Sequence, residues 1–527
     1  MTTSPQFSAA ELVVVTPVSI RTIGKFKKIL PIAALVGLCV LIFSLRLHTY
    51  NEPLERDLTA YAVIAHEMLH GKNLYSDLWD HKPPATYVTY AAAEWIAGYG
   101  RNSIFLMNVA AAMATLVACY FAGSAGGRGP VAGLVAATFW TIASGDLAIE
   151  GNQPNTEVFL NLLLTTAFAI FARSERSRIG FTRAWLIGAL FAIASFYKQI
   201  VVVEAVFLSL GYLWCVEGQF RKKAFLEIGL IGLIGAAAWA LLFGYFFLSG
   251  RGDAFVEAIF TYNRWYSAHP PRDLSELWNW PGLSPDALMV ALSIAALAAI
   301  GLMIGLTFCP RRGWVLLLAF GLATYVTVQL PGWFFPHYYQ LWLPPLVIGA
   351  GWGVELLKRV LPQRLAWSSY ALAAVCFAVL LMMEIPCYLA PAPSWSVQKY
   401  GGIFLETEQL AAKIDNLLPR GAKLYEWGNE PGFYFATRRE PASGFLFAYH
   451  MQDGPLARKL SSKLLHDLSG NEPELIIAAN LTMSLTPQHP VAKWLEQNYR
   501  PFWRTNSFVV MARKGGELDR TQPVAQN

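Results

Sequence analysis

The sequence predicts a mainly α-helical, multi-pass membrane protein with a small α/β domain outside the membrane near its C-terminus. Of the 527 residues, 55% are hydrophobic and only 14% are charged, and the mean hydropathy is +0.38. Soluble globular proteins carry about 25% charged residues, so this composition indicates a membrane protein. Apolar segments recur up to about residue 390, and short strand-like and helical runs follow them.

The basic residues indicate how the chain is oriented in the membrane. Lys25, Lys27 and Lys28 precede the apolar run that starts at Leu30, so residues 1–29 are expected in the cytoplasm. The net charge of +6 is assigned to membrane orientation, and no nucleic acid partner is expected. The six cysteines lie in or beside apolar segments and indicate neither a disulfide framework nor a cysteine metal site.

About eleven spans are expected within residues 30–390, the transmembrane domain. The apolar segment 85–98 is too short to cross, because as a helix it reaches only about 21 Å against a hydrocarbon core of about 30 Å. It is expected to be an interfacial helix in a first external loop, residues 46–103. The dense basic clusters then fall in the cytoplasm, and the C-terminus lies outside. The expected spans are 30–45, 104–122, 131–148, 157–173, 184–197, 200–216, 224–248, 286–308, 314–330, 337–357 and 367–388.

The external α/β domain is expected over residues 391–515, and residues 516–527 are expected to be disordered. Its predicted strands are 423–426, 444–447, 475–479 and 508–512, and its predicted helices are 405–418 and 454–468.

On this topology, several polar segments meet at the non-cytoplasmic face. Polar clusters beside a bilayer usually mark a site rather than a solvated loop. The candidates are Asp57, Asp80, His81 and Lys82 in the first loop, residues 150–157, Lys198, the loop with Asn263, Tyr266 and His269, and His337 with Tyr338.

Each candidate also has a plain structural explanation, which the sequence leaves open. Asp57 and Glu157 can be first-turn acids that interact favourably with a helix dipole. Asn155 can cap the helix that carries Glu157. His269 and His337 can be interfacial residues hydrogen-bonded to water.

Two other function classes stay open. His66-Glu67-x-x-His70 matches the HExxH pattern by which a helix binds zinc in metalloproteases. Here the pattern lies in an amphipathic segment, whereas multi-pass zinc proteases place it inside an apolar span. A transporter would carry paired charges at mid-membrane. The sequence places few there, and the exceptions, Glu204 and Glu227, lie near segment ends.

The first loop contains Asp57-x-x-x-Tyr61, then Gly71-x-x-x-Tyr75-x-Asp77, then Asp80-His-Lys-Pro-Pro84. This run resembles the first loop of the protein mannosyltransferase-like GT-C glycosyltransferases, a family that includes the lipid A aminoarabinose transferase and bacterial polyprenyl-phosphate-sugar transferases. Asn155-Thr156-Glu157 and His337-Tyr-Tyr, with Pro344-Pro345 downstream, also resemble that family. The resemblance covers roughly residues 30–390 and is most specific in the first loop.

The chain departs from the family pattern at two positions. Leu58 follows Asp57 where the family often has a second acid, and His81 stands where some relatives carry a metal-binding glutamate. The resemblance therefore leaves a divalent metal open, with His81, His269 and His337 as candidate ligands, and no other cofactor is assigned.

The resemblance implies a GT-C-like enzyme of the bacterial inner membrane. Such an enzyme moves a sugar from a polyprenyl-phosphate carrier to a lipid, glycan or protein acceptor on the non-cytoplasmic face. An inverting transfer needs a carboxylate base, and its lipid phosphate leaving group needs a cation. Asp57 falls on the family's catalytic acid and Glu157 near its second acidic position, and Lys82 falls on the lysine suited to phosphate. Lys198 is assigned to the phosphate as well, and Tyr61, Tyr75, Asp80, Asn263, Tyr266 and Tyr338 are assigned to substrate binding.

Overall fold

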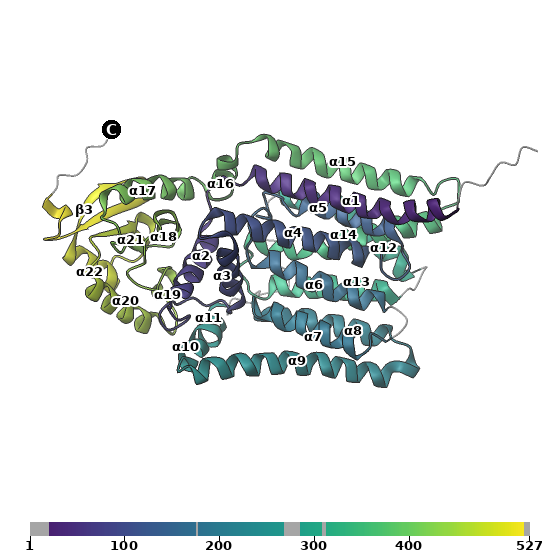
Figure 1. Ribbon diagram of the computed structural model, residues 1–527, viewed down its shortest axis with the longest axis horizontal. Coiled ribbons are helices and arrows are strands. Elements are labelled where there is room, and N and C mark those ends of the chain that lie inside the picture. The colour runs from purple at the N-terminus through teal and green to yellow at the C-terminus, as the bar shows by residue number, and fades with distance from the viewer. Residues whose placement is uncertain (1–19, 175–177, 268–284, 308–311, 521–527) are drawn as a thin grey trace, which may run out of the picture.

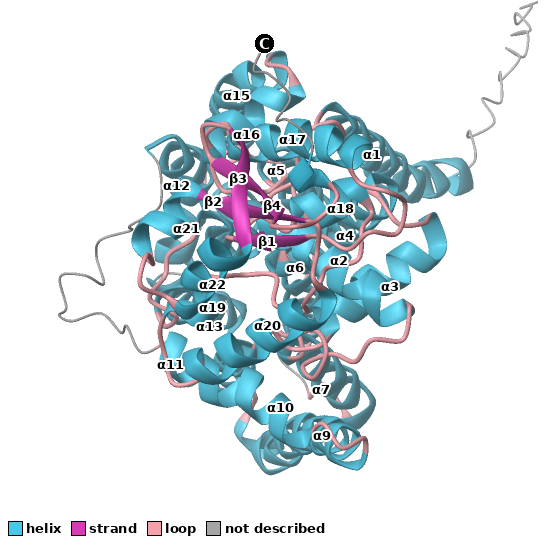
Figure 2. Ribbon diagram, turned by 90° about the vertical axis from the view of Figure 1, so that its left-hand side faces the viewer, coloured by secondary structure: helices cyan, strands magenta, loops and turns pink. Residues whose placement is uncertain are grey.

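The computed structural model describes residues 20–174, 178–267, 285–307 and 312–520. Figure 1 shows a body of long, roughly parallel helices with a smaller domain at one end, which contains the strands. Figure 2, which looks at the smaller domain, shows its sheet in front of the end of the helical body. The expected mainly α membrane architecture with a C-terminal α/β domain is therefore confirmed. His269 and the end of the tail, residues 521–527, lie outside the described residues.

The helical body is built from long apolar helices with shorter elements between them. Its first half contains α1 (Ile20–His48), α2 (Arg56–Leu69), α3 (Ala85–Ala97), α4 (Arg101–Gly123), α5 (Pro130–Ala143), α6 (Thr156–Arg173), α7 (Phe181–Ser195), η1 (Gln199–Val201) and α8 (Val202–Cys215). Its second half contains η2 (Gly218–Phe220), α9 (Arg221–Leu248), α10 (Gly252–Val256), the π-helical η3 (Glu257–Tyr262), α11 (Asn263–Tyr266), α12 (Pro285–Thr307), α13 (Arg312–Gln329), η4 (Pro336–Trp342), α14 (Leu343–Val360) and α15 (Ser368–Leu389).

Seven helices of the described chain are long and apolar enough to cross a membrane: α1, α4, α6, α9 with η2, α12, α13 and α15. The chain is a multi-pass integral membrane protein. Three other expected spans, α5, α7 and η1 with α8, form shorter apolar helices. A fourth, α14, carries Glu355, Lys358 and Arg359 within its last two turns. The count of about eleven therefore stays a prediction.

Burial separates central from peripheral helices. α6 is mostly buried, whereas the apolar faces of α1 and α9 are mostly exposed, as expected of helices whose neighbours are lipid chains. α2 and α3 lie between the helical body and the small domain (Figure 1). α3 is the segment predicted to be interfacial, and it is not among the candidate spans.

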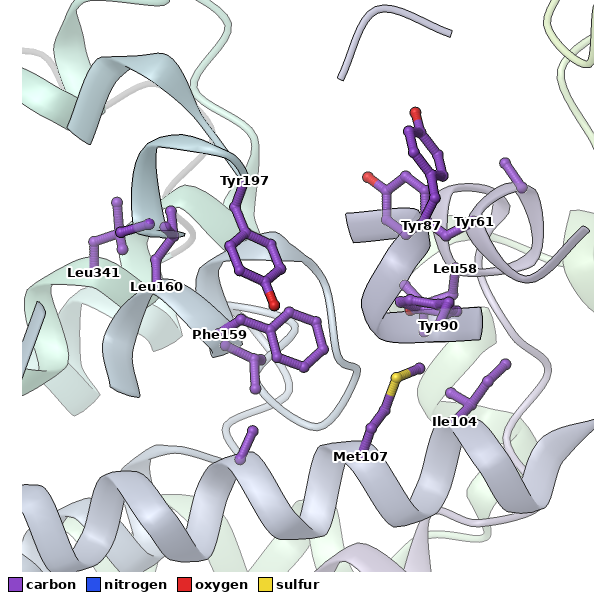
Figure 3. Close-up of a cluster of buried hydrophobic side chains, with 14 of the residues drawn as sticks. Leu58, Tyr61, Tyr87, Tyr90, Ile104, Met107, Phe159, Leu160, Tyr197 and Leu341 are labelled. Carbon is purple, nitrogen blue, oxygen red and sulfur yellow. The ribbon is translucent and has the colours of Figure 1, made fainter. Parts of the chain in front are cut away.

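Aromatic packing holds α2 against α3 within the first loop. The ring of Tyr61 on α2 lies edge-on to those of Tyr87 and Tyr90 on α3, with centroids 6.0 and 5.4 Å away. Figure 3 shows these rings opposite Phe159 and Tyr197, which stack on each other at 5.3 Å. Contacts of this kind add about 0.5–1.5 kcal/mol each beyond the area that they bury. They hold the start of α2, where the candidate site begins.

The C-terminal domain is a four-stranded sheet covered by helices. Strand order is β1-β2-β4-β3, with β1 parallel to β2 and the other pairs antiparallel. The strands are β1 (Tyr425–Trp427), β2 (Leu475–Ala479), β3 (Tyr499–Arg504) and β4 (Phe508–Arg513). The helices are α16 (Ala392–Tyr400), α17 (Ile403–Leu417), α18 (Gly432–Thr437), α19 (Tyr449–Gln452), α20 (Ala457–Asn471), α21 (Asn480–Leu485) and α22 (Pro490–Asn498).

Three details differ from the sequence-based expectation. Residues 444–447 form no strand, because their backbone meets the first loop instead, where Trp79 donates its N–H to the carbonyl of Gly444 at 3.0 Å. Strand β3 was not predicted, since it contains Pro501 and lies at the sheet edge beside a register shift. Part of the segment expected to be disordered is folded, because residues 518–520 form η5 (Leu518–Arg520) and Asp519 pairs with Arg500.

Candidate active site

Asp57 and Lys82, far apart in the first loop, form an ion pair. Asp57 lies in the first turn of α2, where the helix dipole favours a carboxylate. Lys82 follows His81 and precedes two prolines that break the chain before α3. The Lys82 Nζ donates to Asp57 Oδ2 at 3.0 Å, and both side chains are mostly buried. Two residues assigned to catalysis and phosphate binding therefore meet at one point.

The surroundings of Asp57 keep it ionised. Burial alone would raise its pKa, but the positive charge of Lys82, the interaction with His337 and the hydrogen bond from Lys82 together outweigh this and lower the pKa to about 2. The Tyr61 hydroxyl donates to the same Oδ2 at 3.1 Å. In this arrangement Asp57 is charged but is a weak base, because its pKa is low and its Oδ2 accepts from both Lys82 and Tyr61.

Glu157 and Lys198 form a second pair of the same kind. Glu157 is the second residue of α6 and is fully buried, with Oε2 accepting from the Thr156 hydroxyl at 2.9 Å. Lys198, in the turn after α7, donates to Glu157 Oε1. The ammonium also lies 3.9 Å from the centre of the Tyr338 ring, a cation–π contact. The expected cap is present, since Asn155 Oδ1 accepts from the Thr156 N–H at 2.8 Å.

Several predicted substrate-binding residues shape the loop around Lys82. The ring of Tyr61 lies 4.7 Å from Lys82 Nζ. The Tyr75 hydroxyl donates to the backbone carbonyl of Lys82 at 2.9 Å. Tyr75 itself has φ of +71°, a conformation that β-branched or bulky residues rarely adopt, so the loop turns sharply here. Tyr61 and Tyr75 thus orient Lys82 from both ends of the residue.

Asn263 and Tyr266 lie on the far side of the same loop. The Asn263 amide donates to the His81 carbonyl at 2.6 Å, so this side chain positions the first loop. The Tyr266 ring packs beside the His81 ring at 4.9 Å and stacks on Trp333 at 4.7 Å. The loop that contains both residues was predicted to lie near the first loop, and the structure places it there.

A second buried cluster joins the first loop to the C-terminal domain. His81 Nδ1 lies 3.0 Å from Asp80 Oδ1 and 3.1 Å from Nε2 of His450, which belongs to α19. The three donor atoms all lie within 4.8 Å of one another. Asp80 Oδ2 and His450 Nδ1 are buried without a hydrogen-bond partner in the described chain. A carboxylate with two imidazoles is a donor set suited to a divalent transition metal such as Zn²⁺.

His450 was not predicted from the sequence. Nothing in the run around it indicates that this part of the C-terminal domain folds onto the first loop. His337, by contrast, was expected as a possible metal ligand and lies apart from the cluster of Asp80 and His81. Its Nδ1 lies 3.0 Å from Glu150 Oε2. Glu150 was recognised only as part of the polar loop 150–157.

The HExxH pattern does not form a metal site in this structure. His66 Nδ1 lies 2.6 Å from Glu94 Oε1, and Glu67 pairs with Lys72 at 2.8 Å. His70 is exposed, and its Nδ1 lies 2.7 Å from the His66 carbonyl oxygen. Their donor atoms do not converge as those of the Asp80 cluster do. The geometry therefore gives the metalloprotease hypothesis no support.

An apolar groove of about 460 Å³ runs between α7, α8 and α9. Small residues of α7 and α9 line it, including Ala192, Gly232 and Gly235. Ser195 and Trp239 also belong to its lining. Lys198 lies in the chain between two lining residues of the groove, Ser195 and Val201, and it pairs with Glu157. A long hydrocarbon chain in this groove would bring an attached anionic head to Lys198.

Comparisons with known proteins agree with this architecture. No family model and no curated protein matches the chain. Among solved structures, ArnT from Cupriavidus metallidurans bound to undecaprenyl phosphate is similar, with a TM-score of 0.59 at 15% identity over 91% of this chain and 97% of that one. Archaeal oligosaccharyltransferase AglB from Archaeoglobus fulgidus, in complex with an inhibitory peptide and a dolichol-phosphate, has a TM-score of 0.52 at 12% identity, over 94% and 75%. The chain has the fold of the GT-C membrane glycosyltransferases.

Proposed function

We propose that this protein is a membrane glycosyltransferase that moves a sugar from a polyprenyl-phosphate carrier to an acceptor hydroxyl on the non-cytoplasmic face. The fold hosts enzymes that use lipid-linked sugars, and the structurally similar ArnT was solved bound to undecaprenyl phosphate. Fold similarity alone does not assign an activity, so the proposal rests on the site.

The observation that carries the proposal is the presence of two lysine–carboxylate pairs within electrostatic reach of each other, with Lys198 of one pair lying in the chain between groove-lining residues Ser195 and Val201. Lys82 and Lys198 supply two ammonium groups for a lipid phosphate, and the groove supplies room for its prenyl chain. Asp57 and Glu157 supply the carboxylates that a transfer to a hydroxyl requires. A transporter or receptor would have no need of this combination at one place.

Donor binding activates the base in this mechanism. The donor phosphate attracts Lys82 and Lys198, and each lysine leaves its carboxylate to contact a phosphate oxygen. Asp57 then loses the charge that lowers its pKa to about 2, while burial, which raises it, remains. The carboxylate becomes a stronger base only when the donor is present.

The transfer itself is an in-line displacement. Asp57 takes the proton of the acceptor hydroxyl, whose oxygen forms a bond to the anomeric carbon on the face opposite the phosphate. The bond between that carbon and the phosphate oxygen breaks, and its electron pair stays on the phosphate. The two lysines stabilise the charge that develops there, and the sugar's configuration is inverted.

The lipid-binding part of the proposal can be tested by filling the groove. Gly235→Leu places a side chain in the groove, and a Cβ at that position meets no atom within 4 Å, so the fold should accept it. Gly229→Leu, on the same helix α9, has the same open surroundings but does not line the groove. Binding of undecaprenyl phosphate to protein in nanodiscs should weaken for Gly235→Leu and stay unchanged for Gly229→Leu. Equal affinity of both variants would contradict the groove assignment.

The proposed orientation places the N-terminus in the cytoplasm and the site and C-terminal domain outside. A topology reporter fused after Arg178 should be cytoplasmic, and one fused after Pro393 should be external. Finding both reporters on one side of the membrane would contradict the proposed orientation and with it the face on which transfer occurs.

A further inference from the structure

Glu150 is held in an unusual backbone conformation at the edge of the site. Its φ is +57°, in the left-handed region that non-glycine residues other than Asn and Asp rarely adopt. The conformation is fixed because the Gln340 amide donates to the carbonyls of both Ile149 and Glu150, each at 3.1 Å. Such conformations cost of order 1–3 kcal/mol and cluster at functional sites. The structure therefore holds this carboxylate in one place despite an energetic cost.

The side chain of Glu150 orients one imidazole. His337 Nδ1 lies 3.0 Å from Glu150 Oε2, and both side chains are about nine-tenths buried. The His337 ring is nearly parallel to that of Phe335, at 5.7 Å, and edge-on to that of Tyr338, at 5.0 Å. A carboxylate on Nδ1 fixes the ring and leaves Nε2 for a ligand. Nε2 has no hydrogen-bond partner within the described parts of the chain.

His337 lies between the two acids of the site. When protonated, its imidazolium interacts electrostatically with Asp57 of α2 and with Glu157 of α6, two carboxylates that belong to different lysine pairs. Tyr338, its neighbour in η4, contacts Lys198. The imidazole is thus within electrostatic reach of both places where a phosphate would displace a carboxylate.

The charged groups around His337 carry no net positive charge that could neutralise an anionic ligand. Asp57 is paired with Lys82 and Glu157 with Lys198, so these four groups cancel. Nearby Glu55 adds no charge, because burial raises its pKa well above the ordinary value. Glu150 remains as an additional acid beside the imidazole. A phosphate that enters adds at least one further negative charge, and a proton on His337 is the means by which the site can balance it.

We propose that His337, oriented by Glu150, takes up a proton when the lipid phosphate binds, and that its Nε2–H then donates a hydrogen bond to the phosphate oxygen that leaves the sugar. The inference rests on the proposed function and adds a third cationic group to the two lysines. His337 touches the leaving group, and Glu150 is the positioning residue that acts through it.

The step balances without any further reactant. The acceptor's proton goes to Asp57, the new bond joins the acceptor oxygen to the anomeric carbon, and the electron pair of the broken bond goes to the phosphate oxygen. That oxygen changes from a bridging atom to one that carries charge, and the hydrogen bond from His337 Nε2–H strengthens as it does so. The product phosphate carries one more negative charge than the donor diester, so the proton on His337 matters most at this stage.

Proton uptake on binding is the measurement that distinguishes this role from a packing role. Undecaprenyl phosphate is titrated into nanodisc-embedded protein by calorimetry at pH 7.5, in buffers with different heats of ionisation. Wild-type protein should take up at most about one proton per bound lipid, the proton that the inference assigns to His337. The groups that face His337 from neighbouring elements are Asp57, Glu150, Glu157, Lys198 and Tyr338, and none of them is altered in the test of His337.

His337→Gln should abolish the uptake and weaken binding by about tenfold or more, as expected for loss of a charge-assisted hydrogen bond. Glu150→Gln keeps an acceptor for Nδ1–H but removes the charge, so uptake should decrease. His466→Gln, an exposed histidine on α20, is the matched control and should bind and take up protons as the wild type does. Thermal unfolding and detergent gel filtration verify that each variant is folded, and either of the first two carries the test if the other does not fold.

Unchanged proton uptake in folded His337→Gln or Glu150→Gln would overturn the inference. Wild-type binding without any uptake would overturn it too, while leaving the lipid-phosphate assignment intact. Failure of wild-type protein to bind undecaprenyl phosphate would instead contradict the proposed function, so the two failures are distinguishable.

Discussion

Replacing Lys82 by methionine tests the coupling between donor binding and the base. Methionine keeps most of the apolar stem beside the Tyr61 ring and removes the ammonium, whose Nζ lies 3.0 Å from Asp57 Oδ2. A charge-assisted contact to the donor phosphate contributes about 1.5–3 kcal/mol, so its loss should weaken donor use by roughly 10- to 100-fold. The expected result is a higher KM for the lipid-linked sugar.

The same substitution should also change the pH dependence of the reaction. In the wild type the pKa of Asp57 is about 2, so this carboxylate is ionised throughout the accessible range and kcat/KM has no acid limb from it. Without Lys82, burial dominates and raises the pKa above the ordinary value for aspartate, so the base becomes protonated at mildly acidic pH. An acid limb should then appear between about pH 4 and pH 6.

The assay is steady-state transfer by protein in nanodiscs, with donor titrated at each of several pH values. Lys82→Arg keeps the charge and should show a smaller defect without the acid limb, although its planar fork fits the pocket differently. Lys72→Met is the matched control, because Lys72 lies in the same loop and pairs with Glu67 and Glu440 away from the site. A Lys82→Met enzyme with donor KM within about twofold of wild type and no acid limb would refute the reasoning.

Three further predictions concern the rest of the chain. His70→Ala should leave transfer unchanged when assayed with and without zinc, and a loss that only zinc restores would favour the metalloprotease hypothesis. Glu430→Gln should change how the free energy of unfolding depends on pH. Burial raises the pKa of Glu430 to about 7, against the effect of Arg56. The stability that protonated Glu430 contributes is therefore present at low pH and is lost as the pH rises through 7. In chemical unfolding of the wild type, the free energy of unfolding should fall by about 3 kcal/mol between about pH 4.5 and pH 7 because of Glu430, and this fall should be absent in the variant. A fall of the same size in the variant would contradict the prediction. Zn²⁺ should raise the melting temperature of wild-type protein but not of His450→Gln, and an equal rise in both would exclude His450 as a ligand.

The membrane helices were predictable because their signal is local. A run such as that of α4 or α15 is apolar over its whole length, and lipid imposes that composition regardless of tertiary packing. The exclusion of α3 from the candidate spans also follows from its length alone, and its interfacial position stays a prediction. The prediction of a strand at 444–447 was wrong. The apolar residues of this segment indicate that it is buried but do not indicate which segment it pairs with, and it pairs with the first loop at Trp79.

The site was predictable where the residues share one loop and not where they meet through the fold. Asp57 and Lys82 were both identified, but their direct contact depends on how α2 and the prolines before α3 bend the loop. The approach of His450 to His81 depends on how the C-terminal domain docks, and no local pattern encodes that. The partnership of Glu150 with His337 required the backbone conformation at Glu150, which the sequence does not reveal.

The central claim is that Asp57 is the base for sugar transfer, and Asp57→Asn tests it most directly. Asparagine keeps the size, and the N-cap of α2 is Glu55 rather than Asp57, so a variant that is folded by thermal unfolding separates a catalytic role of Asp57 from a structural one. It also leaves Lys82 free for the phosphate, so binding of undecaprenyl phosphate should be retained or strengthened. Single-turnover transfer by the purified variant should fall by about 10²- to 10⁴-fold with donor binding intact. Transfer at close to the wild-type rate would contradict the assignment and move the base to Glu157.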